Sequence, residues 1–148
     1  MTVLRSALYA VLPLLAAAPA VAQTHTGHDE DAAIRQVIQS AYIEGMHMNT
    51  SRAQARAGFH PEFIMFVRSD EGVRRVTLDE WIGRLPPEGT PPGRDVTADI
   101  SVLSRDGMTA AAKAEVSFDG QQVFTDYFLL YHTDGRWRIV GKAFQSHR

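Results

Sequence analysis

The sequence predicts an α+β fold in which a curled antiparallel sheet forms a cone around an amino-terminal helix. Three observations lead to this prediction. An amphipathic segment opens the folded part of the chain, two short helical segments follow, and the carboxy-terminal half alternates apolar and polar residues between Asp-Gly pairs. Helices first and strands afterwards are typical of α+β domains. The open end of such a cone is a natural cavity for a ligand.

The first helix is expected over residues 31–48. Apolar or small residues recur there at steps of three and four: Ile34, Val37, Ile38, Ala41, Gly45 and Met48. At about 100° per residue these positions form one stripe, with Tyr42 at its edge. The same spacing places His47 with Gln36 and Ser40 on the solvent side.

Two further short helices and a short hairpin are expected next. Ser51 can cap a helix over residues 52–57, and Gly58 ends it. Thr77 and Glu80 have the spacing of a capping box, which predicts a helix that runs to about residue 84. Between these helices we expect strands over residues 63–67 and 73–76.

Four consecutive strands are expected in the carboxy-terminal half. They cover residues 95–105, 108–118, 121–132 and 136–145. Asp-Gly pairs at 106–107, 119–120 and 134–135 separate them. An Asp-Gly pair between alternating apolar runs is the strongest short-range signal of a hairpin. Three such pairs in succession predict a four-stranded antiparallel meander.

The first 22 residues have the pattern of a cleaved secretory signal peptide. Arg5 precedes an apolar run over residues 7–18, and small residues spaced Ala-x-Ala end at Ala22. The apolar run is shorter than the roughly 20 residues that a membrane-spanning helix needs. We therefore expect a periplasmic or secreted protein of about 126 residues that stays free of the membrane after cleavage. Residues 23–31 are expected to be flexible and residues 32–148 to form one domain.

Composition excludes several classes of function. The chain has 15 basic and 17 acidic residues, a formal net charge of −2, so the clustered basic surface of a nucleic-acid-binding protein is not expected. It has no cysteine, which excludes thiol catalysis, disulfides and cysteine-ligated zinc. No phosphate-binding glycine loop or His-Glu-x-x-His motif is present. No cofactor is therefore expected.

Hairpin parity identifies the residues that share a face of the sheet. An even-length turn pairs odd with even positions across its two strands. The last Asp-Gly turn then places Asp126 on the concave face with Trp137, and Lys142 on the opposite face. The preceding turn places Lys113 beside Asp126. A bulge in either hairpin would shift this register.

Asp126 is the first candidate for a functional residue. Among apolar neighbours its pKa would be expected to rise, which suits a general base or a carboxylate that binds a ligand. The alternative is a structural salt bridge with Lys113, which would keep the carboxylate ionised. The two interpretations are nearly balanced.

Four other side chains are candidates for ligand contacts. Tyr42 could point its hydroxyl into the cavity, or pack as an aromatic residue at the rim. His60, in a Phe-His-Pro connection, could bind a ligand, although such a histidine more often bonds to the backbone of its turn. Lys113 could hold a ligand together with Asp126. Trp137 is expected to be a core residue first and a ligand contact second.

The expected mature amino terminus carries a weaker metal hypothesis. Cleavage after Ala22 would place His25 third in the chain, where an amine, two amide nitrogens and an imidazole can bind Cu²⁺ or Ni²⁺. His28 could add a ligand. The simpler interpretation, a disordered tail without metal, is favoured.

Several short motifs resemble a known family. They are Tyr-Ile-Glu-Gly at 42–45, Phe-His-Pro at 59–61, Thr-Asp-Tyr-Phe at 125–128 and Asp-Gly-Arg-Trp-Arg-Ile-Val-Gly-Lys at 134–142. With these the chain resembles the nuclear transport factor 2-like superfamily, also called ketosteroid isomerase-like or SnoaL-like. Within it, the chain is similar to the lumazine-binding branch of exported bacterial proteins. The resemblance runs from about residue 32 to residue 144.

Three functions remain open at this stage. The first is an exported domain that binds a small, planar or heteroaromatic molecule between the first helix and the sheet; the resemblance implies a pterin- or lumazine-like ligand. The second is an isomerase or dehydratase that uses Asp126 as general base, with Tyr42 or His60 as oxyanion stabiliser. The third is an assembly module. The resemblance implies a homodimer, which would use the exposed face of the sheet with Tyr127, Tyr131 and Val140.

Overall fold

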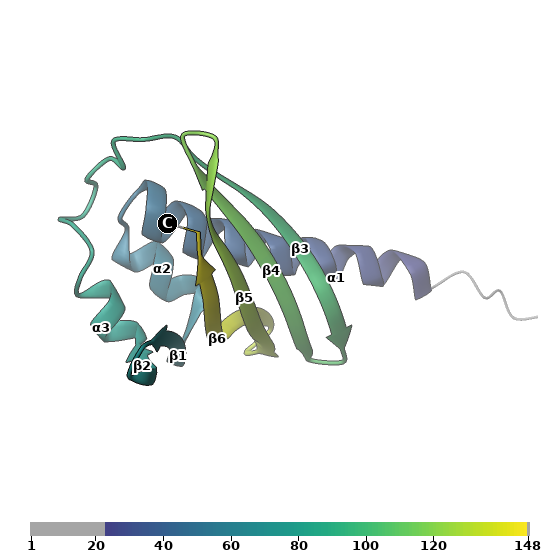
Figure 1. Cartoon of the computed structure of the whole chain (residues 1–148). Coiled ribbons are helices and arrows are strands. Elements are labelled where there is room, and N and C mark those ends of the chain that lie inside the picture. Colours follow the sequence, from purple (N-terminus) through teal and green to yellow (C-terminus); the bar gives the residue numbers. More distant parts are fainter. Residues whose placement is uncertain (1–22, 148) are drawn as a thin grey trace, which may run out of the picture.

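The structure confirms the predicted architecture of helices followed by a curled antiparallel sheet. The computed structural model describes residues 23–147, so the predicted signal peptide, residues 1–22, lies outside the described residues. One six-stranded sheet has the order β2-β1-β6-β5-β4-β3. Its strands curl over the amino-terminal helical segment, and the short helices α2 and α3 lie toward one end of the molecule (Figure 1).

Ten elements follow one another along the chain. The helices are α1 (Gln23–Val37), η1 (Ile38–Met48), α2 (Arg52–Gly58) and α3 (Leu78–Ile82). The strands are β1 (Phe59–Ser69), β2 (Gly72–Thr77), β3 (Val96–Asp106), β4 (Thr109–Phe118), β5 (Gln121–Thr133) and β6 (Arg136–Ser146). None of the helices within residues 23–147 is long and apolar enough to cross a membrane.

The four expected carboxy-terminal strands form the predicted meander. Strands β3 to β6 pair with their sequence neighbours in antiparallel register. In the last two turns Asp119 and Asp134 take φ angles of 50° and 53°, and each is followed by a glycine with positive φ. Two successive positive φ angles are the geometry that Asp-Gly pairs favour in tight hairpins. Strand β1 then adds to β6 in parallel and carries β2 at its outer edge.

The helical segment differs from the expectation in two ways. Helix α1 begins at Gln23, so residues 23–31 are helical where a flexible segment was expected. From Ile38 to Met48 the chain forms the π-helix η1, in which hydrogen bonds join residues five apart. Because a π-helix has more residues per turn than an α-helix, spacing at 100° per residue misplaces side chains along η1.

A bulge in the last hairpin shifts the register that parity predicted. Leu130 pairs with Ile139 but Leu129 pairs with Gly141, so Val140 is an extra residue in β6. Beyond it every β6 side chain is on the face opposite to the predicted one. Lys142 therefore points to the concave face, and its placement on the outer face was wrong.

A second irregularity moves Lys113 to the outer face. The pairing of β4 with β5 shifts between Val116 and Ser117, so that Lys113 lies opposite Tyr127 and Ala114 lies opposite Asp126. The predicted proximity of Lys113 and Asp126 on the concave face is therefore wrong. Lys113 instead pairs with Glu115 on the outer face, at 3.3 Å.

Candidate functional site

Three polar side chains meet in the interior between η1 and the sheet. The Tyr42 hydroxyl donates a hydrogen bond to Oδ2 of Asp126 at 2.7 Å. The Lys142 ammonium lies 2.6 Å from Oδ1 of the same carboxylate. The three residues are 1 %, 0 % and 5 % exposed, in that order. We refer to Tyr42, Asp126 and Lys142 as the interior polar cluster.

Each member of the cluster comes from a different element. Tyr42 lies in the middle of η1, Asp126 is buried on β5, and Lys142 follows the bulge of β6. Asp126 pairs with Phe144, and Phe128 pairs with Lys142, so the carboxylate and the amine are diagonal neighbours on the concave face. The bulge at Val140 is thus what brings the lysine to the carboxylate.

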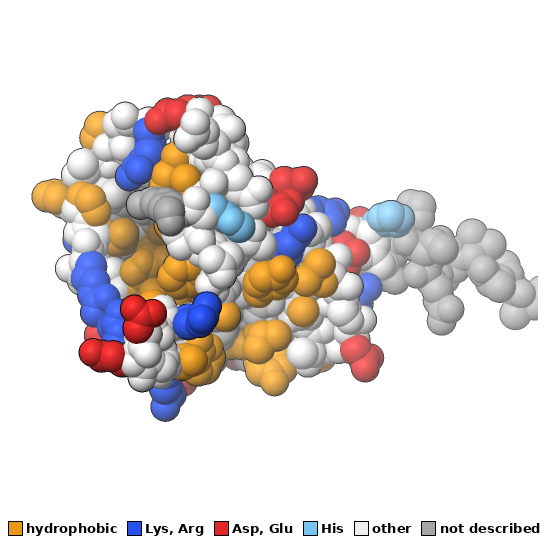
Figure 2. Space-filling view, viewed as in Figure 1, with side chains coloured by type: hydrophobic (Ala, Val, Ile, Leu, Met, Phe, Trp, Pro, Cys, Tyr) orange, Lys and Arg blue, Asp and Glu red, His pale blue; other side chains and the backbone are white. Residues whose placement is uncertain are grey.

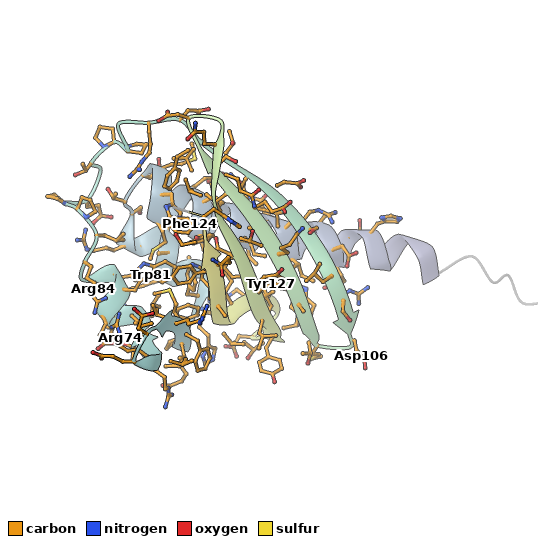
Figure 3. The ribbon with its side chains drawn as sticks, viewed as in Figure 1. Arg74, Trp81, Arg84, Asp106, Phe124 and Tyr127 are labelled. Carbon is orange, nitrogen blue, oxygen red and sulfur yellow. The ribbon has the colours of Figure 1, made fainter. Side chains whose placement is uncertain are left out.

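Aromatic rings enclose the amine. The Lys142 Nζ atom lies 4.8 Å from the ring centroid of Tyr42, 5.0 Å from that of Trp81 and 4.5 Å from that of Phe144. Rings at these distances stabilise a cation through their negative faces. Trp81 extends from the short helix α3 (Figure 3) and, like Phe144, is only partly buried. The cluster is therefore separated from solvent mainly by aromatic side chains.

Burial dominates the electrostatics of the cluster. Desolvation raises the pKa of Tyr42 well above its ordinary value, and the charge and hydrogen bond of Asp126 raise it further. Desolvation lowers the pKa of Lys142, while Asp126 partly opposes this effect. The neutral phenol donates to one oxygen of the carboxylate and the amine contacts the other.

The structure brings two of the sequence-predicted residues together and separates the others. Tyr42 and Asp126 are bonded. His60 accepts a hydrogen bond at Nδ1 from the backbone N–H of Glu62, so it bonds within its own turn. Trp137 shares the concave face but donates its indole N–H to Glu30 of α1. Lys113 is on the outer face.

The metal hypothesis at the amino terminus stays untested. The side chain of His25 lies outside the described side chains. Among the residues that the structure describes, no group of three or more histidine, aspartate or glutamate side chains is arranged to hold a metal ion.

Sequence reasoning missed Lys142, His47 and Trp81. Parity without the bulge placed Lys142 outside, and α-helical spacing placed His47 on the solvent side. In the π-helix the His47 ring instead lies 4.8 Å from the Tyr42 ring, edge to face. The rings of Trp81 and Phe63 stack with their centroids 5.8 Å apart. The two residues belong to different elements, so no local sequence pattern predicts this contact. One signal was available for Lys142: it is one of only two lysines in the chain.

An open pocket lies away from the interior polar cluster. It has a volume of about 480 Å³ and lies between the helices and the turn that joins β5 to β6. Its lining includes Gln36, Ser40, His132, Arg136 and Trp137. Trp137 thus lines this pocket, whereas Asp126 is not among its lining residues.

The fold and the site define a cone-shaped α+β domain with a polar cluster in an aromatic interior. The family model described as "Putative lumazine-binding" matches residues 29–145. The chain therefore belongs to this family, and its fold is that of solved nuclear transport factor 2-like (NTF2-like) proteins. Fold and family are those of a ligand-binding domain.

Individual relatives agree with this assignment. A curated relative, "Aldolase FrzH" from Cladobotryum sp, is 28 % identical over 123 residues, which cover 82 % of this chain and 94 % of the relative. Among solved structures, an NTF2-like protein of unknown function from Shewanella baltica OS155 has a TM-score of 0.64 at 22 % identity, covering 85 % of this chain and 98 % of that one. Another, from Methylobacillus flagellatus KT, also has a TM-score of 0.64, at 24 % identity, covering 81 % and 94 %. These two structures establish the fold alone.

Proposed function

We propose that the protein is an exported domain that binds a small planar or heteroaromatic molecule at the interior polar cluster. The observation that carries the proposal is the buried contact of Asp126 with both Tyr42 and Lys142. A buried ion pair is often no more stabilising than apolar residues of equal volume. An ion pair buried on the concave face is therefore better explained by recognition of a ligand than by a contribution to stability.

The surroundings of the cluster favour a planar ligand. Trp81, Phe144 and Tyr42 present ring faces or edges to the cluster, and Phe128 contacts Tyr42 edge-on at 5.2 Å. A flat ring system can stack on such groups while the carboxylate, phenol and amine bond to its edge. The description of the family, with lumazine as ligand, supports this class of molecule.

Thermal shift with a matched pair of variants tests this function. Lumazine, pterins, flavins, steroids and polyketide-like acids are screened for a rise in melting temperature. Asp126→Asn should abolish the rise for any active compound, whereas Glu115→Gln on the outer face should leave it unchanged. The proposal fails if no compound raises the melting temperature, or if the Asp126→Asn protein is stabilised as much as the wild type.

A second candidate function is enzymatic, with Asp126 as general base. The short Tyr42–Asp126 hydrogen bond supports it, because it places a proton donor beside a carboxylate in a dry interior. A relative named as an aldolase, 94 % of which is covered, supports carbonyl chemistry. In an isomerase or dehydratase, Asp126 would remove a proton and Tyr42 would stabilise the developing oxyanion. Unchanged ligand affinity with lost turnover in Asp126→Asn would favour the enzyme; lost affinity without turnover in either protein favours the binder.

The proposed export has its own test. The pattern over residues 1–22 supports cleavage after Ala22 and a periplasmic or secreted location. Amino-terminal sequencing of the protein from cell fractions should begin at Gln23. A chain in the cytoplasmic fraction that retains Met1 would overturn this proposal.

A homodimer through the outer face of the sheet completes the proposed function. Large apolar side chains are exposed on the strands: Phe66, Leu103, Tyr127, Leu129 and Tyr131. Figure 2 shows apolar side chains gathered on the face of the molecule over the sheet. Such a patch on a soluble domain is typical of an interface. Light scattering should give twice the chain mass for the wild type and the single chain mass for Leu129→Asp; a monomeric wild type contradicts the dimer.

A further inference from the structure

The use of lysine in this chain is unusually restricted. Thirteen arginines supply nearly all of the positive charge, and the only lysines are Lys113 and Lys142. Arginine is the ordinary partner in a buried ion pair, because its guanidinium is weakly hydrated and always charged. A lysine at such a position differs in one chemical respect: it can lose its proton and become a nucleophile.

We propose that Lys142 is a nucleophilic amine that forms an imine with the carbonyl group of a bound ligand. The inference rests on the proposed function in one respect, namely that a small molecule reaches the interior polar cluster. It adds a covalent step and a class of ligand, an aldehyde or ketone, to simple binding.

The geometry of the cluster is that of an activated nucleophile. Such a site consists of a nucleophile, a base within hydrogen-bond reach, and a third group that orients the base. Here Lys142 Nζ lies 2.6 Å from Oδ1 of Asp126. The Tyr42 hydroxyl, 2.7 Å from Oδ2, holds the same carboxylate in place. All three groups are buried, so water does not compete for these bonds.

The environment favours the reactive form of the amine. Desolvation lowers the pKa of Lys142, so a larger share of its amine is neutral than for a solvated lysine at the same pH. The aromatic rings around Nζ provide an apolar enclosure that also stabilises the cationic iminium.

The proposed step balances with groups of the cluster alone. Asp126 accepts a proton from the Lys142 ammonium, and the freed electron pair of the nitrogen attacks the carbonyl carbon. One of the two protons left on the nitrogen then passes to the former carbonyl oxygen, which gives a neutral carbinolamine. The protonated Asp126 carboxyl donates its proton to the carbinolamine hydroxyl, which leaves as water while the C=N bond forms, and the nitrogen keeps its last proton as an iminium beside the Asp126 carboxylate. Ammonium plus carbonyl gives iminium plus water, with no oxidant or reductant.

Lys113 is a built-in control for this reactivity. It also lies near a carboxylate, 3.3 Å from Glu115, but its side chain is 28 % exposed on the outer face. Replacing Lys113 by Arg keeps its charge and leaves a protein whose single lysine is Lys142. The substitution is far from the cluster, so the fold should be preserved.

Reductive trapping tests the proposal. Wild type and Lys113→Arg are incubated at about neutral pH with propionaldehyde and sodium cyanoborohydride, which reduces an imine to a stable secondary amine. Peptide mass mapping then separates Lys142 from Lys113 and from the terminal amine. Lys142 should be alkylated several-fold faster than Lys113, because burial lowers the pKa of Lys142 and so enlarges the neutral, nucleophilic share of its amine. Tyr42→Phe should slow Lys142 several-fold and leave Lys113 unchanged.

Two results overturn the proposal. The first is that Lys142 is not labelled in the folded protein but is labelled after unfolding in guanidinium. The second is that Lys142 and Lys113 react at equal rates. These failures are distinct from failure of the binding function. Compounds that raise the melting temperature without labelling of Lys142 leave binding intact and exclude the imine. Labelling of Lys142 when no screened compound raises the melting temperature supports the reactive amine and rejects that set of ligands.

Discussion

The two faces of the sheet each carry one lysine–carboxylate pair, and the pairs differ in almost every physical respect. On the outer face Lys113 and Glu115 lie 3.3 Å apart, with side chains 28 % and 39 % exposed. On the concave face Lys142 and Asp126 lie 2.6 Å apart, with side chains 4 % and 0 % exposed. Solvent screens the first pair, whereas the second interacts through a medium of low dielectric constant.

This difference separates a surface interaction from a chemical site. An exposed ion pair is easily replaced by water, and losing one partner leaves the other hydrated. A buried pair must keep both partners, because a charge left alone in the interior has no solvent to stabilise it. The concave pair also has a third member, Tyr42, whereas the outer pair lies beside Tyr127, which is exposed (Figure 3).

Removing the inner carboxylate should have the largest effect. Asp126→Ala leaves Lys142 and the Tyr42 hydroxyl without a partner, and should lower the free energy of unfolding by about 3–5 kcal/mol. Urea denaturation followed by circular dichroism measures the loss. Replacing both charges together, as in Asp126→Leu with Lys142→Met, should restore most of it. A loss as small as that of the outer-face variant below would remove the distinction between the two pairs.

Removing the phenol should have an intermediate effect that depends on pH. Tyr42→Phe deletes a hydrogen bond to a carboxylate and should cost about 1.5–3 kcal/mol near neutral pH. Because the pKa of Tyr42 is raised in the folded protein, its stabilisation is present below the pKa of an unfolded tyrosine, about 10, and is lost as pH rises further. The pKa of Lys142 is lowered in the folded protein, so its contribution to the free energy of unfolding rises with pH, in the direction opposite to that of Tyr42.

Comparing wild type with Tyr42→Phe isolates the effect of the phenol, because both proteins contain Lys142. The difference in unfolding free energy between wild type and Tyr42→Phe should shrink above about pH 10. Urea titrations at a series of alkaline pH values measure it. A difference that stays constant across this range would mean that Tyr42 is not protonated preferentially in the folded state.

Removing the outer carboxylate should have the smallest effect. Glu115→Ala should change the free energy of unfolding by no more than about 1 kcal/mol, because its ion pair with Lys113 is exposed. Whatever contribution exists should fall as sodium chloride is raised, since salt screens surface charges. A larger, salt-independent loss would show that the outer pair stabilises the protein as the buried pair does, and would remove the distinction between the two pairs.

The sequence predicted the hairpins well because their signals are local. Each Asp-Gly pair specifies a turn through the backbone preferences of two residues, and alternation of apolar residues then defines the strands on either side. Local alternation also placed Asp126 correctly on the concave face, whereas helical spacing put Tyr42 at the edge of the apolar stripe and left open whether it points into the interior or packs at the rim. These two candidates meet in the structure at 2.7 Å.

The partner of Asp126 could not be predicted in this way. Parity counts residues from a turn, and one extra residue reverses every position beyond it. The bulge at Val140 and the shift between Val116 and Ser117 exchanged the two lysines, so that Lys142 and not Lys113 faces the carboxylate. The π-helix had the same effect on His47, whose contact with Tyr42 depends on a different number of residues per turn.

The sequence by itself determined the order of elements, the turns and the inward direction of Asp126, because each depends on residues close together in the chain. Only the tertiary structure decided which lysine lies beside Asp126 and which rings enclose it. Bulges and π-helical turns change which side chains face one another, so the neighbours of Asp126 depend on contacts between elements that local patterns do not specify. The chemistry of the interior polar cluster therefore depends on long-range packing.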